Sequence, residues 1–187
     1  MIEKFKNPFR FLPLRQAICW GIAAMILTAV YCWQVGLRMT SITQVNYAGG
    51  ALWKATVSQV VVWLLFSVVL YVVGLMLSRS KIRFWDVAAY NLFARLPFNL
   101  SLLVFAVPQV RSVMALLMEG SLATVMQYQG TLMLVSVVAA VFSVWYYVWT
   151  YNAFSVATNL KGFKGVSLFI VGWLVAYVLS GYTMMLF

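Results

Sequence analysis

The chain has 187 residues, of which 65% are hydrophobic and 9% are charged, whereas a soluble domain carries about 25% charged residues. This composition excludes an ordinary soluble domain and predicts one compact membrane domain with no room for a second globular unit. The net charge of +10 does not indicate nucleic acid as a partner, because the 13 Lys and Arg lie mainly at the ends of apolar runs, as membrane topology requires. Anionic lipid headgroups are the expected partner.

The sequence contains no histidine, which excludes His-ligated haem, His-based zinc sites and histidine general bases. Cys19 and Cys32 fall in one predicted helix, about 20 Å apart along its axis. They cannot form a disulfide with each other, because a disulfide needs α-carbons within about 7 Å. We therefore expect buried free thiols, no metal and no cofactor.

A basic leader, residues 1–15, precedes the first apolar run. It mixes Lys4, Lys6, Arg10 and Arg15 with several phenylalanines, a composition that suits a segment lying on lipid headgroups. The run behind it is long and ends without a small-residue cleavage site, so we expect a retained span and not a signal peptide.

Five apolar runs follow, each long enough for a membrane-spanning helix of about 20 residues. The expected spans are residues 16–37, 51–78, 84–107, 131–156 and 165–186, all in one domain covering 16–187. The predicted fold is all-α, a polytopic integral membrane protein built as a bundle of five transmembrane helices. A polar loop should fill the gap after the first span, and one or two short interfacial helices should occupy residues 109–130, where apolar residues recur at helical spacing.

The cations predict the orientation through the positive-inside rule. With a cytoplasmic N-terminus, the cytoplasmic side holds nine cations: Lys4, Lys6, Arg10, Arg15, Arg79, Lys81, Arg83, Lys161 and Lys164. The opposite side holds three: Arg38, Lys54 and Arg111. We therefore expect the N-terminus in the cytoplasm and, after five spans, the C-terminus outside.

Stripes of small residues predict how the helices pack, because lipid tails are as apolar as the helices and close backbone approach must hold the bundle together. The fifth span carries Gly172, Ala176 and Ser180 at spacings of four. One face of the fourth span carries Ser136, Ala140, Ser143, Tyr147 and Thr150. We expect these stripes to pack inside the bundle, and a contact between copies of the chain is the alternative.

Arg95 is the first candidate for chemistry, because it lies about 16 Å into the third span, near the middle of the membrane. An arginine there costs about 2.5–3.5 kcal/mol on insertion scales. Asn91 and Asn99 lie four residues on either side, and Pro97 removes a backbone donor. One hypothesis is a polar pocket for an anionic group formed by Asn91, Arg95, Pro97 and Asn99. The other is a kinked helix whose polar groups satisfy one another.

A second candidate site is a cytoplasmic partner surface made of Asp86, Tyr147, Tyr151 and Asn152. Asp86 also suits the start of a helix, where a carboxylate is favoured by the helix dipole. The tyrosines also suit an aromatic anchor belt at the membrane interface. Asp86 and Glu119 fall on opposite sides of the predicted membrane, so they cannot form a carboxylate pair for acid–base catalysis.

Several short motifs occur in a characteristic order. They are Asn7-Pro8-Phe9, the basic hinge before the third span, Phe84-Trp85-Asp86-Val87-Ala88-Ala89-Tyr90, Ala94-Arg95-Leu96-Pro97, Trp145, Lys161, and Gly162-Phe163-Lys164-Gly165. The chain thereby resembles the Yip family of membrane proteins, first known for interacting with Ypt/Rab GTPases, in its compact prokaryotic form. The resemblance implies five spans, a cytoplasmic N-terminus and a bacterial cytoplasmic (inner) membrane.

These observations favour a non-enzymatic, Yip-like integral membrane protein that organises or regulates partner membrane proteins or lipids. Its expected partners are lipids with anionic headgroups, other membrane proteins or further copies of itself, and not nucleic acid. The alternative is a small-solute or lipid transporter or channel built on the kinked third span around Arg95 and Pro97. A membrane enzyme ranks third, since no nucleophile is placed beside a base.

Overall fold

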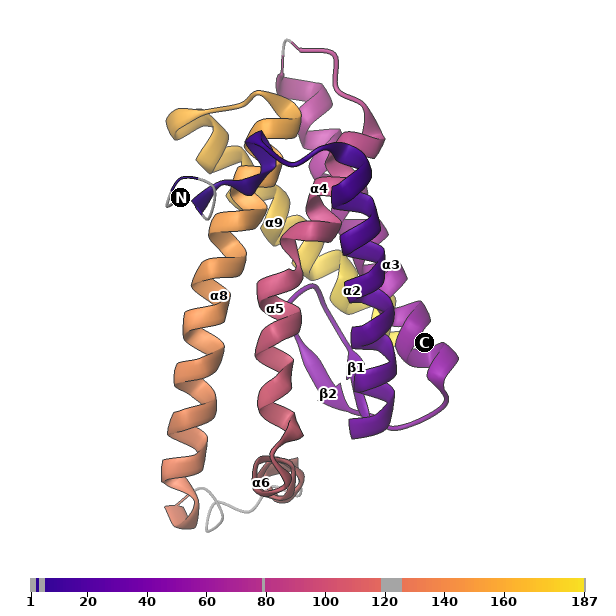
Figure 1. Cartoon of the computed structure of the whole chain (residues 1–187), viewed down its shortest axis with the longest axis vertical. Helices are drawn as coiled ribbons and strands as arrows, with labels where there is room; N and C mark the ends of the chain where they lie inside the picture. Colours follow the sequence, from indigo (N-terminus) through magenta and orange to yellow (C-terminus); the bar gives the residue numbers. More distant parts are fainter. Residues whose placement is uncertain (1–2, 4–5, 79, 119–125, 187) are drawn as a thin grey trace.

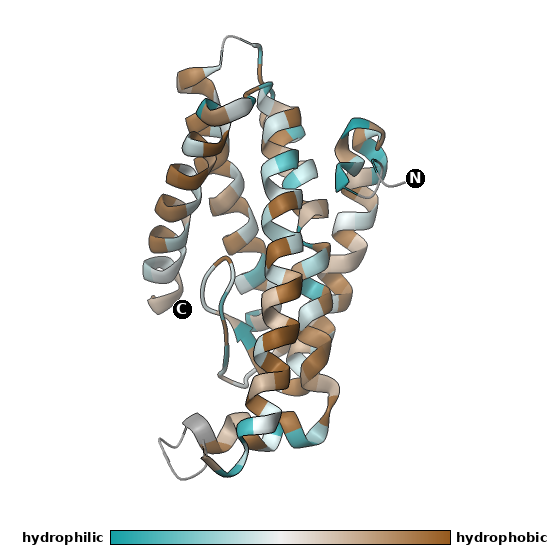
Figure 2. Cartoon of the chain, turned by 90° about the vertical axis from the view of Figure 1, so that its left-hand side faces the viewer, coloured by the Kyte–Doolittle hydropathy of each residue, from teal (hydrophilic) through white to brown (hydrophobic). Residues whose placement is uncertain are grey.

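The computed structural model is a helical bundle that describes residues 3, 6–78, 80–118 and 126–186. Within those residues, five helical segments are long and apolar enough to cross a membrane. The first, third and fourth run roughly along the long axis of the molecule, and the second and fifth cross it obliquely (Figure 1). Brown, hydrophobic residues dominate the long helices, while many of the teal, hydrophilic ones lie near the two ends (Figure 2). The prediction of a bundle with five apolar spans is confirmed.

The observed helices begin and end within three residues of the predicted spans. They are α2 (Leu14–Val35), α3 (Leu52–Leu77), the third span (Phe84–Ala106), α8 (Gln129–Thr158) and α9 (Gly162–Met185). Gly36 ends α2 in the left-handed conformation at φ 73°, which glycine adopts without steric cost.

The third span is broken into three pieces: α4 (Phe84–Ala94), α5 (Leu96–Ser101) and the 3₁₀ helix η2 (Leu102–Ala106). The break lies at Arg95, two residues before Pro97, whose ring supplies no backbone donor. Helical bonding resumes at once, because the Asn99 amide donates to the Arg95 carbonyl at 2.9 Å. The span is therefore interrupted but not ended by its proline.

One short helix, α6 (Pro108–Met118), lies in the third loop, across the end of the bundle in Figure 1. Val110 and Val113 on α6 are buried, as the helical spacing of apolar residues predicted. A second short helix in this loop would fall partly on residues 119–125, which lie outside the described part of the chain, as do Lys4, Arg79, Glu119 and Gly120.

The polar loop after the first span contains a hairpin that the sequence analysis did not predict. It forms an antiparallel hairpin of β1 (Leu37–Met39) and β2 (Val45–Tyr47), with Arg38 opposite Asn46. Ile42 at its tip is fully buried, and the Ser41 hydroxyl lies 2.7 Å from that of Ser180 on α9. Pairing satisfies the backbone of this segment where it enters the bundle, since unpaired backbone is costly away from water.

Small residues hold the other helices close. A β-carbon added to Gly21 on α2 would lie 2.7 Å from Leu92 on α4, and one added to Gly74 on α3 would lie 2.7 Å from Thr158 on α8. Gly172 on α9 faces Leu70 of α3 in the same way, at 3.2 Å. Gly172, Ala176 and Ser180 are all buried, so the stripe of the fifth span packs inside the bundle, as expected.

The stripe of the fourth span packs as expected only at its end, where Thr150 is fully buried. Ser136 and Ala140 are exposed on the surface of the chain, and Val137 and Val141 beside them are 54% and 61% exposed. The cause is the hairpin and the broken third span, which fill the centre of the bundle and leave the first half of α8 at its side (Figure 1). Only the second half of α8 packs tightly, through Tyr146, Thr150 and Phe154.

Candidate functional site

The Arg95 side chain is sealed inside the bundle, with an exposed fraction of 4%. Its guanidinium carbon lies 5.9 Å from the centre of the Phe98 ring, a cation–π geometry. Phe98 in turn contacts Tyr146 of α8, with 5.8 Å between ring centres. The break after α4 thus places a cation among aromatic rings from two different spans, far from either end of the chain's long helices.

Several polar atoms around Arg95 have no hydrogen-bond partner within the described residues. They are Nη1 of Arg95, Oδ1 of Asn91 and the hydroxyl of Tyr146. The amide nitrogen of Asn91 is satisfied, because it donates to Ser67 Oγ at 3.1 Å. Burying polar atoms without partners costs folding free energy. These three atoms therefore leave unused hydrogen-bonding capacity inside the bundle.

The predicted pocket residues separate into two groups. Asn91, Arg95 and Pro97 are buried together in the interior. Asn99 is half-buried and lines a different feature, a groove of about 340 Å³ between α2 and α5 whose other walls include Tyr31 and Leu103. The single polar face expected from the four-residue spacing is therefore divided between the interior and this groove.

The predicted partner surface is also divided. Tyr147 lies in an apolar groove beside α9, where its ring contacts Trp173 edge-on at 5.4 Å. Asp86 is half-buried in the first turn of α4. Tyr151 and Asn152 instead line a polar cavity near the end of α8, which composition and periodicity could not reveal.

That cavity exists because the N-terminal leader folds back onto the bundle. Phe9, in the short 3₁₀ helix η1 (Pro8–Arg10), is 2% exposed. Its ring meets those of Tyr90, Phe93 and Trp149 edge-on, at 5.6, 6.0 and 5.9 Å. Edge-to-face contacts of this kind add about 0.5–1.5 kcal/mol each beyond burial. The leader is therefore docked by an aromatic anchor.

Two hydrogen bonds fix the leader on either side of Phe9. Asn152 on α8 donates through its amide nitrogen to the Lys6 carbonyl at 2.8 Å. The Tyr90 hydroxyl on α4 donates to the Leu12 carbonyl at 3.4 Å. The sequence marked the leader as a basic surface segment, but only the fold shows that it is tied to α4 and α8.

The polar cavity beside the leader, which we call the leader cavity, has a volume of about 390 Å³. The polar side chains that line it are Asn7, Arg10, Tyr151, Asn152, Ser155, Asn159 and Lys161. No carboxylate lines it among the described residues. Asn7 lines the cavity, and its Oδ1 is buried at the wall without a hydrogen-bond partner in the described part of the chain. The arrangement can bind a negatively charged group that also offers a hydrogen-bond donor.

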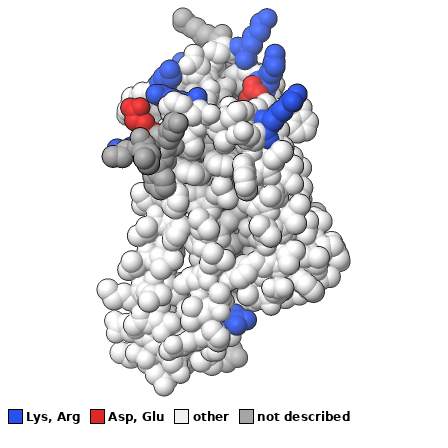
Figure 3. All heavy atoms as spheres, in the orientation of Figure 1, with Lys and Arg blue, Asp and Glu red and all other residues white. Residues whose placement is uncertain are grey.

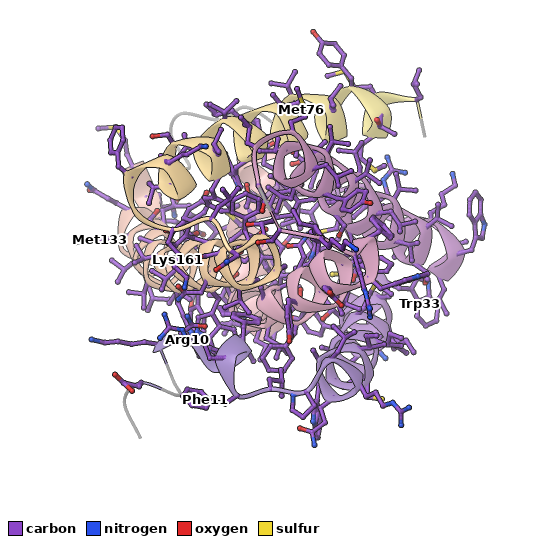
Figure 4. The ribbon with its side chains drawn as sticks, turned by 90° about the horizontal axis from the view of Figure 1, so that it is seen from above. Arg10, Phe11, Trp33, Met76, Met133 and Lys161 are labelled. Atoms are coloured by element: carbon purple, nitrogen blue, oxygen red, sulfur yellow. The ribbon has the colours of Figure 1, made fainter. Side chains whose placement is uncertain are left out.

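The leader cavity lies at the strongly basic end of the molecule. In Figure 3 most of the blue Lys and Arg atoms gather at the end that carries the leader. The leader, the turn before α4 and the turn before α9 meet there (Figure 1). Arg10 and Lys161 come from two of these segments and lie on the same side of the bundle when that end is viewed directly (Figure 4).

The described residues thus form a sealed polar cluster around Arg95 and, apart from it, an open polar cavity beside Arg10. The described residues contain no group of three or more His, Cys, Asp or Glu that could hold a metal ion. No family model, no curated protein and no solved structure matches the chain.

Proposed function

We propose that this chain is a non-enzymatic, Yip-like integral membrane protein of a bacterial cytoplasmic membrane, whose basic end organises partner membrane proteins or lipids. The observation that carries the proposal is the docked leader, which turns a flexible basic segment into a fixed, cavity-forming surface.

The basic end is proposed to face the cytoplasm. The described cations at this end are Lys6, Arg10, Arg15, Lys81, Arg83, Lys161 and Lys164, against Arg38, Lys54 and Arg111 elsewhere outside the bundle interior. The positive-inside rule favours this orientation, and α9 runs away from the basic end, so the C-terminus would lie outside. In this orientation α6 would rest on the outer surface of the membrane.

Photo-crosslinking in native membranes tests the proposed function. A crosslinking amino acid replaces Phe163, which is 89% exposed at the basic end, and in a matched control it replaces Trp53, which is 59% exposed near the start of α3. We expect defined protein or lipid adducts at Phe163 and few at Trp53. Equal, featureless labelling at both positions would contradict a specific role for the basic end.

The Arg95 cluster supports a second candidate, a transporter or channel for small solutes or lipids. Broken helices with polar groups near the midplane form the binding sites of many transporters, and the unpaired atoms of Arg95, Asn91 and Tyr146 fit that pattern. Because Arg95 is sealed, transport would require α2 or α5 to move. A flux assay in liposomes, with Arg95→Ala as control, tests it: solute movement must exceed that of empty liposomes and be lost in the variant.

A further inference from the structure

The leader cavity lies at the depth of lipid headgroups if α8 spans the membrane. The 30 residues of α8 correspond to about 45 Å of helix, whereas the hydrocarbon core is about 30 Å thick. The last turns of α8, which carry Tyr151, Asn152 and Asn159, therefore extend beyond the hydrocarbon. Exposed aromatic residues at the same end, Trp85 and Phe163, suit the interface between hydrocarbon and water.

The charges of the cavity select a phosphate group. Arg10 and Lys161 line it from separate segments, and a guanidinium binds phosphate through two parallel hydrogen bonds while an ammonium acts as a compact point charge. Arg10 is held in place by its neighbour Phe9, whose ring is locked between α4 and α8. A docked arginine loses less conformational freedom on binding than one on a mobile segment.

The uncharged part of the cavity selects a hydrogen-bond donor. Asn7 Oδ1 is a buried acceptor without a partner in the described chain. The carboxyl end of α8 beside it carries the partial negative charge of the helix dipole, and Asn159 caps that end in the left-handed conformation, at φ 57°. Once the Asn7 side chain turns its Oδ1 toward the cavity, an ammonium or hydroxyl group would satisfy both features, whereas a trimethylated ammonium has no hydrogen to donate.

We propose that the leader cavity binds the headgroup of one glycerophospholipid. Arg10 and Lys161 contact its phosphodiester, and Asn7 Oδ1 accepts a hydrogen bond from its terminal ammonium or hydroxyl group. The site prefers phosphatidylethanolamine or phosphatidylglycerol to phosphatidylcholine. This inference rests on the proposed function, because it names the lipid class that the basic end would hold.

Lipid binding is measured by native mass spectrometry of the delipidated full chain, titrated separately with these three lipids. We expect the first lipid to bind at least about 5-fold more tightly when its headgroup can donate a hydrogen bond, a difference of about 1 kcal/mol. Asn7→Leu should remove this preference. An equal affinity of the unaltered chain for all three lipids would overturn the proposal.

Two double variants with the same loss of charge separate the cavity from the general basic surface. Arg10→Gln with Lys161→Gln removes both cavity cations, and Arg15→Gln with Lys164→Gln removes two cations that do not line it. We expect about a 10-fold loss of affinity in the first pair and less than a 2-fold loss in the second. Equal losses would show diffuse attraction and overturn the site. All four residues are exposed, and unchanged melting temperatures verify the fold.

A soluble headgroup distinguishes a lipid from a free phosphodiester. Glycerophosphoethanolamine at millimolar concentration should not displace the bound lipid, because it lacks the acyl chains that place the headgroup at the cavity. Displacement at micromolar concentration would overturn the lipid assignment. The two proposals can fail separately. If the chain shows no lipid selectivity but still gives defined protein adducts at Phe163, only the lipid site is refuted. If it keeps its lipid selectivity but gives featureless crosslinking, only the proposed function is refuted.

Discussion

The third and fourth spans are both long and apolar, yet they differ sharply in the fraction of their residues that is buried. In the most apolar 18-residue stretch of the third span 56% of the residues are buried, against 6% in that of the fourth. The third span carries Asn91 and Arg95, whose exposure to lipid would be costly, and the bundle encloses this span. The first half of α8 carries no charged residue and faces outward. Burial in this protein follows polarity, since apolar surface gains little by leaving lipid.

The largest effect is expected from a charge on the outward face of α8, because that face lies against lipid. Val141 is 61% exposed near the middle of α8. Val141→Arg would place a guanidinium in hydrocarbon and cost about 2.5–3.5 kcal/mol of insertion free energy. A glycosylation-reporter insertion assay measures this cost, and Val141→Leu is the neutral control. Normal insertion of the arginine variant would show that α8 is covered by another chain.

Filling the contact between α2 and the third span should have the next largest effect. The β-carbon of Gly21→Ala would lie 2.7 Å from Cγ of Leu92, and overpacking of this kind costs about 1–3 kcal/mol. The matched control is Gly130→Ala in the first turn of α8, where no atom lies within 4 Å. SDS unfolding titrations in mixed micelles should show a lower midpoint for the first variant only, and equal midpoints would refute the close packing.

A smaller loss of stability is expected when the hydrogen bond between the third span and α3 is removed. Asn91 Nδ2 donates to Ser67 Oγ at 3.1 Å, and such bonds in membrane proteins contribute about 0.6 kcal/mol on average, up to about 1.7. The coupling energy follows from a double-mutant cycle of Asn91→Ala and Ser67→Ala, measured by the same unfolding titration. A coupling energy of zero would mean that the bond does not stabilise the fold.

The smallest effect on stability is expected from a substitution in the exposed part of the α8 stripe. Ala140→Leu changes a residue that faces away from the bundle, and surface substitutions away from special features usually stay within about 0.5 kcal/mol. Blue-native electrophoresis of this variant also tests the alternative that the stripe joins copies of the chain. An unchanged unfolding midpoint with a changed oligomeric state would place the interface on this face.

The length and apolar character of the helices could be predicted because both depend on local composition. The spans around Gly21, Gly74 and Gly172 begin and end where runs of apolar residues do. The break at Arg95 was also predictable from Pro97, since a missing backbone donor is a local property. The placement of Asn99 was not predictable, because the groove that it lines depends on how α2 packs beside α5.

The hairpin and the docked leader show where local patterns fail. Ser41 bonds to Ser180, 139 residues away, and Phe9 packs on Trp149 of the fourth span. No periodicity in residues 38–50 or in the leader indicates such partners, because each partner lies in another helix. For the same reason the predicted sites included Tyr151 and Asn152 of the leader cavity but missed Asn7, Arg10 and Lys161, which come from other segments.

The sequence by itself determined that five apolar segments would be helical, because a backbone in hydrocarbon must satisfy its own hydrogen bonds within each segment. It also determined that positive charge would gather beyond their ends. The tertiary structure alone decided which segment lies at the centre, that Arg95 is sealed, and that the leader forms a cavity. Those outcomes depend on contacts between distant residues, and side-chain shape selects among many packings of equally apolar helices.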